Sequence, residues 1–203
     1  MALTRLGPNQ AVNLSTNTTG TLGVANGGTG LTSGTTDQIL KFTGSTTIAS
    51  AAEAAGGKVL QVQSMNYSTE KSRTITSYAD TGIDLTITPS ATSSKILVFG
   101  SCGNIGLGNN NTEGIDLKLT STIGGTETDQ IAQLVNNGGV FTNLAGSVYR
   151  DFTGHASFSL LHTTNTTSAV QYKVRYKPTA GNVAAYVQIH SSTSSITAME
   201  IGA

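Results

Sequence analysis

The chain has 203 residues, 37% of them hydrophobic and 11% charged, and its 11 basic and 11 acidic side chains cancel. This length suffices for one domain with a hydrophobic core and an appendage. So sparse a charge offers no basic surface for nucleic acid. The chain has no apolar run of membrane-spanning length and no signal-peptide core after Met1. We therefore expect the protein to be made in a cytoplasm, to bind no nucleic acid and not to insert into a membrane.

Residues 1–56 form the first predicted part, an extended Gly-, Thr- and Ser-rich segment with one aromatic residue, Phe42. Its expected contact residues are widely spaced apolar side chains, namely Leu3, Leu6, Leu14, Leu22, Val24, Leu31, Ile39 and Leu40. Burying so few does not offset a chain-ordering cost of roughly 1 to 2 kcal/mol per residue. We expect the segment to become ordered only against other chains. The Ala-rich run from Ala49 to Gly57 predicts one or two helical turns.

Residues 57–203 form the second predicted part, in which the hydrophobic pattern has a period of two. Clear alternation predicts strands over 83–88, 115–120 and 170–177, and further strands are expected over 158–160, 183–189 and 195–201. Another strand begins at Val59, with a phase shift near Ser64 that predicts a bulge or a twist. Ile96 to Phe99 is apolar on both faces, which is typical of a strand in a sheet centre or against a neighbouring subunit. So many short strands favour an antiparallel β-sandwich of the jelly-roll kind.

Few residues suggest chemistry. Cys102 has no second cysteine and adjoins an apolar strand, so we interpret it as a core residue. His155, His162 and His190 are too scattered for a metal site. The glycines at 27–30 lack the lysine of a phosphate-binding loop. We accordingly predict no catalytic, metal or cofactor site.

Two carboxylate pairs leave an alternative open. Asp80 with Asp84, and Glu127 with Asp129, are interpreted as solvated loop charges. They lack the ligand density of a calcium loop. A polysaccharide-cleaving enzyme would nevertheless need an acidic pair of this kind.

Two surface features remain. Lys173, Arg175 and Lys177 alternate along one strand, which predicts a solvated row that protects a strand edge from unwanted pairing, or else a contact for an acidic sugar or a neighbouring subunit. Loops rich in Asn, Gly, Thr and Ser offer adaptable hydrogen bonds, as carbohydrate contacts require. The candidate host-contact residues in them are Asn109, Asn110, Asn111, Asn136, Asn137 and Asn165.

The run Val24-Ala-Asn-Gly-Gly-Thr-Gly-Leu-Thr-Ser33 resembles a segment of fibre proteins from tailed bacteriophages, especially marine and cyanobacterial ones. The second part is similar to a C-terminal module of the same proteins. The similar segments are Gly57-Lys-Val-Leu-Gln-Val62, Tyr78-Ala-Asp-Thr-Gly82, Ile87-Thr-Pro-Ser-Ala-Thr-Ser-Ser-Lys95 and Ser195-Ile-Thr-Ala-Met-Glu-Ile201.

The resemblance implies a homotrimeric virion protein. Residues 1–56 would attach it to a tail or capsid protein, and residues 57–203 would form an outward head that touches host surface glycan. The chain is short for a fibre, so a capsid decoration or head-fibre protein is the alternative to a tail fibre. A polysaccharide depolymerase and a free carbohydrate-binding module are further alternatives.

Overall fold

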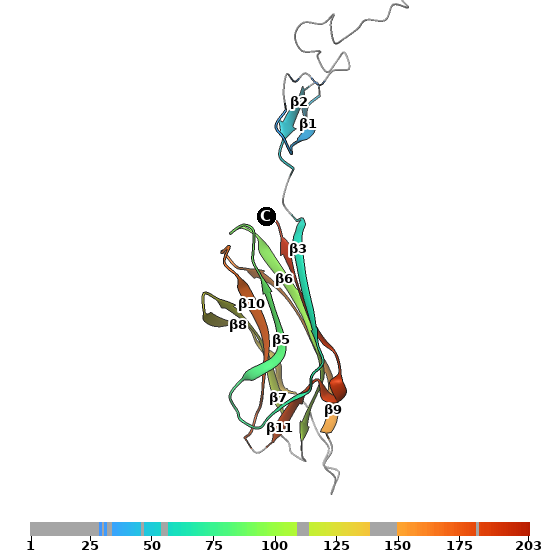
Figure 1. Ribbon diagram of the computed structural model, residues 1–203, viewed down its shortest axis with the longest axis vertical. Coiled ribbons are helices and arrows are strands. Elements are labelled where there is room, and N and C mark those ends of the chain that lie inside the picture. The colour runs from blue at the N-terminus through green and yellow to red at the C-terminus, as the bar shows by residue number, and fades with distance from the viewer. Residues whose placement is uncertain are drawn as a thin grey trace, which may run out of the picture. The chain divides into compact units, whose positions relative to one another are not determined.

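The computed structural model describes residues 29, 31, 34–45, 47–53, 57–108, 114–138, 150–181 and 183–203, with the backbone alone for 136–138 and 150–153. The chain divides into two compact units, Met1–Ala54 and Ala55–Ala203. Each unit is described by itself. Figure 1 shows the elements of both.

The described part of the first unit is an antiparallel hairpin of β1 (Ile39–Gly44) and β2 (Thr47–Ala51). Phe42 pairs with Ile48, and Lys41 pairs with Ala49. The predicted helix from Ala49 is therefore wrong at its start, because pairing with β1 overrides the weak helix preference of a short Ala-rich run. The pairing of β1 with β2 is a local structure that the sequence analysis did not predict within this segment.

The described part of the second unit, called the head below, contains two antiparallel sheets and one short 3-10 helix, η2 (Ile189–Ser191). One sheet has the order β5-β10-β7-β8, and the other has β3-β12-β6-β11-β4 with β9 also paired to β6. Their strands are β3 (Val59–Tyr67), β4 (Lys71–Arg73), β5 (Ala79–Ile87), β6 (Lys95–Gly108), β7 (Ile115–Ile123), β8 (Thr126–Gly138), β9 (Arg150–Thr163), β10 (Val170–Pro178), β11 (Ala184–Val187) and β12 (Ser194–Ile201).

The strand order is that of a jelly roll. Strand β9 pairs along one edge of β6, while β12 and β11 follow each other along the opposite edge. They continue outward to β3 and β4, respectively. Counting β3 with β4 as the first strand and β11 with β12 as the eighth, the two sheets read 1-8-3-6 and 2-7-4-5. The antiparallel β-sandwich prediction is confirmed.

The core lies between the two sheets, and the alternating strands build it as predicted. Ile83, Leu85 and Ile87 of β5 are buried, whereas Asp84 and Thr86 between them are exposed. Every second residue of β10 from Val170 to Tyr176 is likewise buried. The prediction of a central strand over Ile96 to Phe99 is confirmed as well, since β6 has partners on both edges.

Two of the register shifts within the head mark bulges in β3 and β5. The pairing of β12 with β3 shifts between Glu200 and Ile201, so Leu60 is the extra residue, and the bulge predicted near Ser64 is at the wrong position. In β5 the register shifts beside Gly82, which has a φ of 90°. A Cβ added there would lie 2.4 Å from the Tyr67 ring. Glycine is therefore required where this ring covers the strand.

Candidate functional site: an apolar sheet face

The outer side of the sheet formed by β3, β12, β6 and β9 carries side chains in regular cross-strand rows. Inward-pointing Ile96, Val98, Ile196 and Ala198 are fully buried, so their neighbours along each strand point outward. The strand registers place these outward residues in four rows, and each row takes one residue from β3, β12, β6 and β9 in that order. The first row is Val59, Ile201, Lys95 and Thr163, and the second is Val62, Met199, Leu97 and Leu161. The third row is Ser64, Thr197, Phe99 and Ser159, and the fourth is Asn66, Ser195, Ser101 and Ser157. Seven of these sixteen positions are hydrophobic and nine are polar, and we call them together the apolar face after the hydrophobic row that crosses it.

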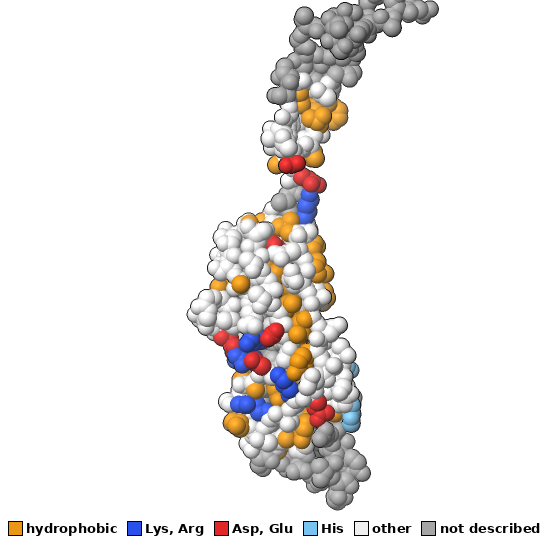
Figure 2. All heavy atoms as spheres, in the orientation of Figure 1, with side chains coloured by type: hydrophobic (Ala, Val, Ile, Leu, Met, Phe, Trp, Pro, Cys, Tyr) orange, Lys and Arg blue, Asp and Glu red, His pale blue; other side chains and the backbone are white. Residues whose placement is uncertain are grey.

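One row of the apolar face is hydrophobic across all four strands. Val62 is 50% exposed and Leu161 is 53% exposed, while Met199 and Leu97 between them are partly exposed. Phe99 in the next row adds a large side chain at 36% exposure. Figure 2 shows hydrophobic side chains along the edge of the head where β3 lies. Contiguous apolar surface of this kind is typical of a contact site.

The bulge in β3 enlarges this hydrophobic surface. Val59 and Leu60 are exposed by 52% and 45%, respectively, although they are consecutive residues. In a regular strand, consecutive side chains point to opposite faces, and the extra residue at Leu60 breaks that alternation. The sequence pattern showed a phase shift in this strand, but only the strand pairing locates it.

A pocket of about 420 Å³ lies at the end of the apolar face where β3 begins. It is lined by Gly57, Ser93, Lys95, Leu161, Ile201, Gly202 and Ala203. Backbone hydrogen bonds from Gly57 N to Gly202 O and from Gly202 N to Lys58 O, both 2.8 Å, hold the chain beside it. The pocket thus combines apolar walls with the single charged side chain of the apolar face, Lys95.

Next to this end, one buried carboxylate joins three segments of the chain. Glu200 is fully buried, and its Oε1 accepts hydrogen bonds from Ser90 N at 2.7 Å and Ser90 Oγ at 2.6 Å. Its Oε2 accepts one from Gln61 Nε2 at 2.6 Å. Burial acts to raise the pKa of this carboxyl, but the hydrogen bonds outweigh it and lower the pKa to about 2. Glu200 therefore connects β12, β3 and the turn after β5 as an anion at neutral pH.

The outer face of the other sheet is charged, and the basic side chains of β10 on it are paired with carboxylates. Lys173 and Arg175 contact Asp80 at 3.5 and 2.8 Å, and Arg175 also contacts Glu127. Lys177 contacts Asp116 at 3.4 Å. In Figure 2, basic and acidic side chains stand side by side in this part of the head. The predicted basic row is thus neutralised within the chain, which leaves it weak as a binding site for an acidic sugar. The predicted protection of a strand edge is wrong, because β10 is paired with β5 on one edge and with β7 on the other.

The predicted carboxylate pairs belong to this same charged face. Asp80 and Glu127 share Arg175, and Asp129 contacts Lys118 at 2.6 Å. Their interpretation as solvated loop charges is therefore wrong in part, because β10 and β7 bring cations to them. Among the described residues, no group of three or more His, Cys, Asp or Glu side chains is placed to hold a metal ion.

The predicted host-contact residues that the structure describes lie at opposite ends of the head. Pairing of Gly108 with Arg150 and of Lys95 with Thr163 defines the two ends. Asn136 and Asn137 belong to β8, near the pairing of Gly138 with Ile115, rather than to a turn. Asn165 is exposed in the loop after Thr163, with a φ of 51°. Asn109, Asn110 and Asn111 lie outside the described residues.

Of the predicted attachment residues, three are described. Leu31 is partly buried, and Ile39 and Leu40 are 46% and 56% exposed in β1. Leu3, Leu6, Leu14, Leu22 and Val24 lie outside the described residues. Sequence reasoning missed Phe42, which is 66% exposed. The sequence analysis also did not identify the apolar face. The one pattern in the sequence that pointed to it was the run Ile96 to Phe99, in which hydrophobic residues occupy both the inward and the outward positions.

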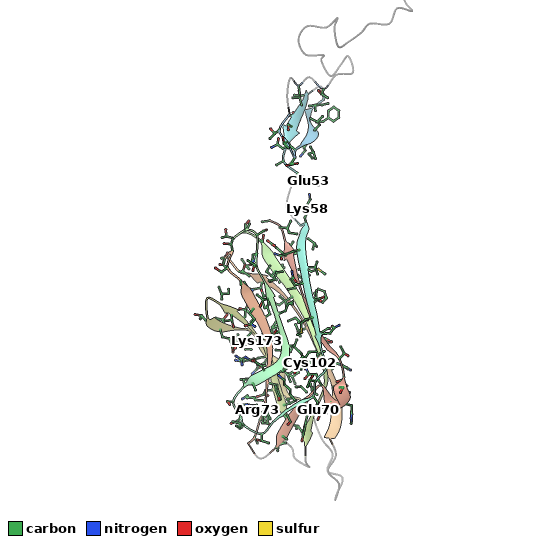
Figure 3. The ribbon with its side chains drawn as sticks, in the orientation of Figure 1. Glu53, Lys58, Glu70, Arg73, Cys102 and Lys173 are labelled. Carbon is green, nitrogen blue, oxygen red and sulfur yellow. The ribbon has the colours of Figure 1, made fainter. Side chains whose placement is uncertain are left out.

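Cys102 and His162 both have surroundings that fit a role in the structure of the head rather than in chemistry. Cys102 is fully buried inside the head (Figure 3), and burial raises the pKa of its thiol to about 12. His162 Nδ1 lies 2.8 Å from the hydroxyl of Tyr172, and burial lowers the pKa of this imidazole. A buried, protonated thiol is a poor nucleophile, which fits the interpretation of Cys102 as a core residue.

Comparisons with known proteins find similar solved structures but no matching family. No protein-family model and no curated protein matches the chain. Similar solved structures include the VP2 subviral particle of infectious bursal disease virus, with a TM-score of 0.38 and 13% identity over 80% of this chain and 36% of that one. The T13 particle of the same virus has a TM-score of 0.35 and 12% identity over 81% and 44% of the two chains. This chain thus spans less than half the length of these viral particle proteins.

No helix in the described residues is long and apolar enough to cross a membrane.

Proposed function

We propose that this chain is a structural protein of a bacteriophage virion, a short homotrimeric fibre. Residues 1–56 bind a tail or capsid protein, and the head projects outward and contacts host surface glycan. The proposal rests on the resemblance of both parts to phage fibre proteins. Localisation to the virion surface follows from it.

One structural observation carries the proposal furthest. Three of the segments that resemble the fibre module, residues 57–62, 87–95 and 195–201, meet at Glu200 through Gln61 and Ser90. They lie far apart in the sequence, yet they hold the two sheets of one jelly roll together. The resemblance therefore involves residues with a shared structural task, as expected of a common head architecture rather than of chance similarity in a Thr-rich chain.

The hairpin supports a role for the first part in contacts between chains. Leu40, Phe42 and Ile48 occupy one face of the hairpin, because Phe42 pairs with Ile48 and Leu40 lies two residues away. An isolated two-stranded hairpin is only marginally stable in water. Covering this face by sister chains or by a virion protein removes its apolar surface from water.

Purified virions test the proposal. Quantitative mass spectrometry of intact particles should detect the chain, with few copies for a tail fibre and many for a capsid decoration protein. Deleting residues 1–56 should abolish incorporation and leave a folded head, as circular dichroism would report. Absence of the chain from purified virions, or normal incorporation of the truncated protein, would contradict the proposal.

A reducing-sugar assay on host polysaccharide addresses the enzymatic alternative. The proposal expects no release of sugar ends. If release occurs, Glu127→Gln and Asp80→Asn are the first variants to compare, since their carboxylates are the sequence-derived candidates for acid and base. Activity that these substitutions abolish would establish a depolymerase instead.

A further inference from the structure

We infer that the apolar face is the surface through which the heads of three copies pack against one another. The inference rests on the proposed homotrimer and deepens it by assigning the contact to one side of the jelly roll. It excludes the charged outer face of the other sheet and both ends of the sandwich as the main contact.

The composition of the apolar face suits contact with identical copies. Lys95 is the only charged side chain among its sixteen positions, and it stands in the end row beside the pocket. Interface centres are depleted in charge, because burying an unpaired charge is costly. In a contact between copies the cost rises further, since equivalent charges of one sign approach each other near the symmetry axis.

The side chains beside the hydrophobic row allow close approach. Ser64, Thr197 and Ser159 flank Phe99 in its row, and the row beyond it consists of Asn66 and three serines. Small side chains let another sheet approach to about 10 Å, the ordinary spacing of packed sheets. Their hydroxyl and amide groups also supply hydrogen bonds at the rim without long flexible chains to order.

The opposite outer face lacks these properties. Lys173, Arg175 and Lys177 alternate along its central strand, and each contacts an acidic residue of a neighbouring strand. Bringing a second copy against that face would desolvate ion pairs that now stand partly in water. The ion pairs of β10 therefore lie on one outer face of the sandwich, and the row of exposed hydrophobic side chains lies on the other.

The area of the apolar face can be compared with what an assembly of three heads needs. Four strands spaced about 4.8 Å apart and four rows spaced about 6.8 Å apart cover roughly 20 by 25 Å, or about 500 Å² in projection. In a trimer each copy divides this face between two neighbours, about 250 Å² for each, so the three contacts together bury roughly 1,500 Å² of projected surface. The assembly as a whole therefore buries an area of the size found in specific protein interfaces, about 1,200–2,000 Å².

Thiol labelling of the full-length chain tests the inference with mild substitutions. Ser159→Cys places a thiol within the apolar face, and Thr86→Cys places one at an exposed position on the other sheet. Native Cys102 is fully buried and contributes no background. In the trimer, maleimide labelling at residue 159 should be slower than at residue 86 by about tenfold or more, because it requires opening of the contact.

Charge insertion supplies the matched control. Val62→Lys with Leu161→Lys in the Ser159→Cys chain should restore fast labelling, even where residues 1–56 still hold the copies together. Ile75 is also a large exposed hydrophobic residue, at 61% exposure, but it lies outside the apolar face. Ile75→Lys in the Ser159→Cys chain should therefore leave labelling slow. Circular dichroism checks that each variant keeps the native strand content.

The outcomes separate this inference from the proposed function. Light scattering on the unmodified chain should give three times the chain mass of 20.8 kDa. A monomer refutes the proposed trimer and this inference together. A trimer in which residues 159 and 86 label at equal rates refutes only this inference, because the apolar face is then left open to another partner.

Discussion

The substitution Glu200→Gln measures how much of the stability of the head depends on one buried anion. The variant keeps the size of the side chain and replaces one carboxylate oxygen with an NH₂ group. Gln61 Nε2 donates to both Glu200 Oε2 and Thr88 O, each at 2.6 Å. Turning the Gln61 amide to accept from the new NH₂ group therefore costs its bond to Thr88.

The magnitude follows from this geometry. If the new amide oxygen faces Ser90, it retains those two donors in weaker, uncharged form. The new NH₂ group then faces Gln61 Nε2, so two donors meet without an acceptor. If the Gln61 amide turns over to accept from the NH₂ group, Gln61 loses its hydrogen bond to Thr88 O. Hydrogen bonds to a charged group contribute about 1.5–3 kcal/mol, and a buried unpaired donor costs about 1–3 kcal/mol. We expect the free energy of unfolding to fall by about 2–4 kcal/mol in total.

Urea denaturation at neutral pH and fixed protein concentration provides the assay, because assembly makes apparent stability depend on concentration. Ser90→Ala is the matched control, since it removes the hydroxyl and keeps the backbone N–H, and it should cost about 1 kcal/mol. A loss below about 0.5 kcal/mol for Glu200→Gln, less than one ordinary hydrogen bond, would refute the reasoning.

The same pair of proteins predicts a dependence on pH. The pKa of Glu200 is about 2 in the folded chain, below its ordinary value of 4.5. Its contribution to stability is therefore complete above about pH 4.5 and is lost as the pH falls toward 2. The stability difference between the native chain and Glu200→Gln should shrink over that range. A difference that stays constant from neutral pH to pH 2.5 would contradict the assigned anion.

Three further predictions concern other parts of the head. Gly82→Ala should lower the free energy of unfolding by about 2–4 kcal/mol, because φ is 90° and the Tyr67 ring occupies the space of the new Cβ; a loss under 1 kcal/mol in urea denaturation would falsify this. Cys102 should resist Ellman's reagent at pH 8 until the chain is unfolded, given its burial and a pKa of about 12, whereas rapid native labelling would contradict it. Asp80→Asn removes partly exposed contacts with Arg175 and Lys173 and should cost about 0–1 kcal/mol, less at high salt; a larger, salt-independent loss would oppose this.

Much of the fold is predictable from the sequence because a strand pattern is local. Alternation in 83–88 and 170–177 identified both the strands and their buried faces, since side chains two residues apart share a face. The first unit was harder. Ala49 to Ala51 has a composition that suits a helix, and its pairing with β1 involves residues outside the run that carried the prediction.

The candidate site was far less predictable from the sequence. Lys173 and Arg175 were visible as a basic row, but their partners Asp80 and Glu127 come from other strands. The Asn-rich stretches looked equivalent, yet Asn137 and Asn165 belong to opposite ends of the head. The composition of a loop does not indicate at which end of the sandwich that loop lies.

By itself the sequence determined the class of structure: strands that alternate, a core from their inner faces, and a preceding segment too poor in apolar residues for a core. The tertiary structure decided which residues meet. Val62, Leu97, Leu161 and Met199 form one row only because β3, β12, β6 and β9 pair in a particular register. Register depends on contacts between strands far apart in the chain, and a shift of one residue would turn the row inward.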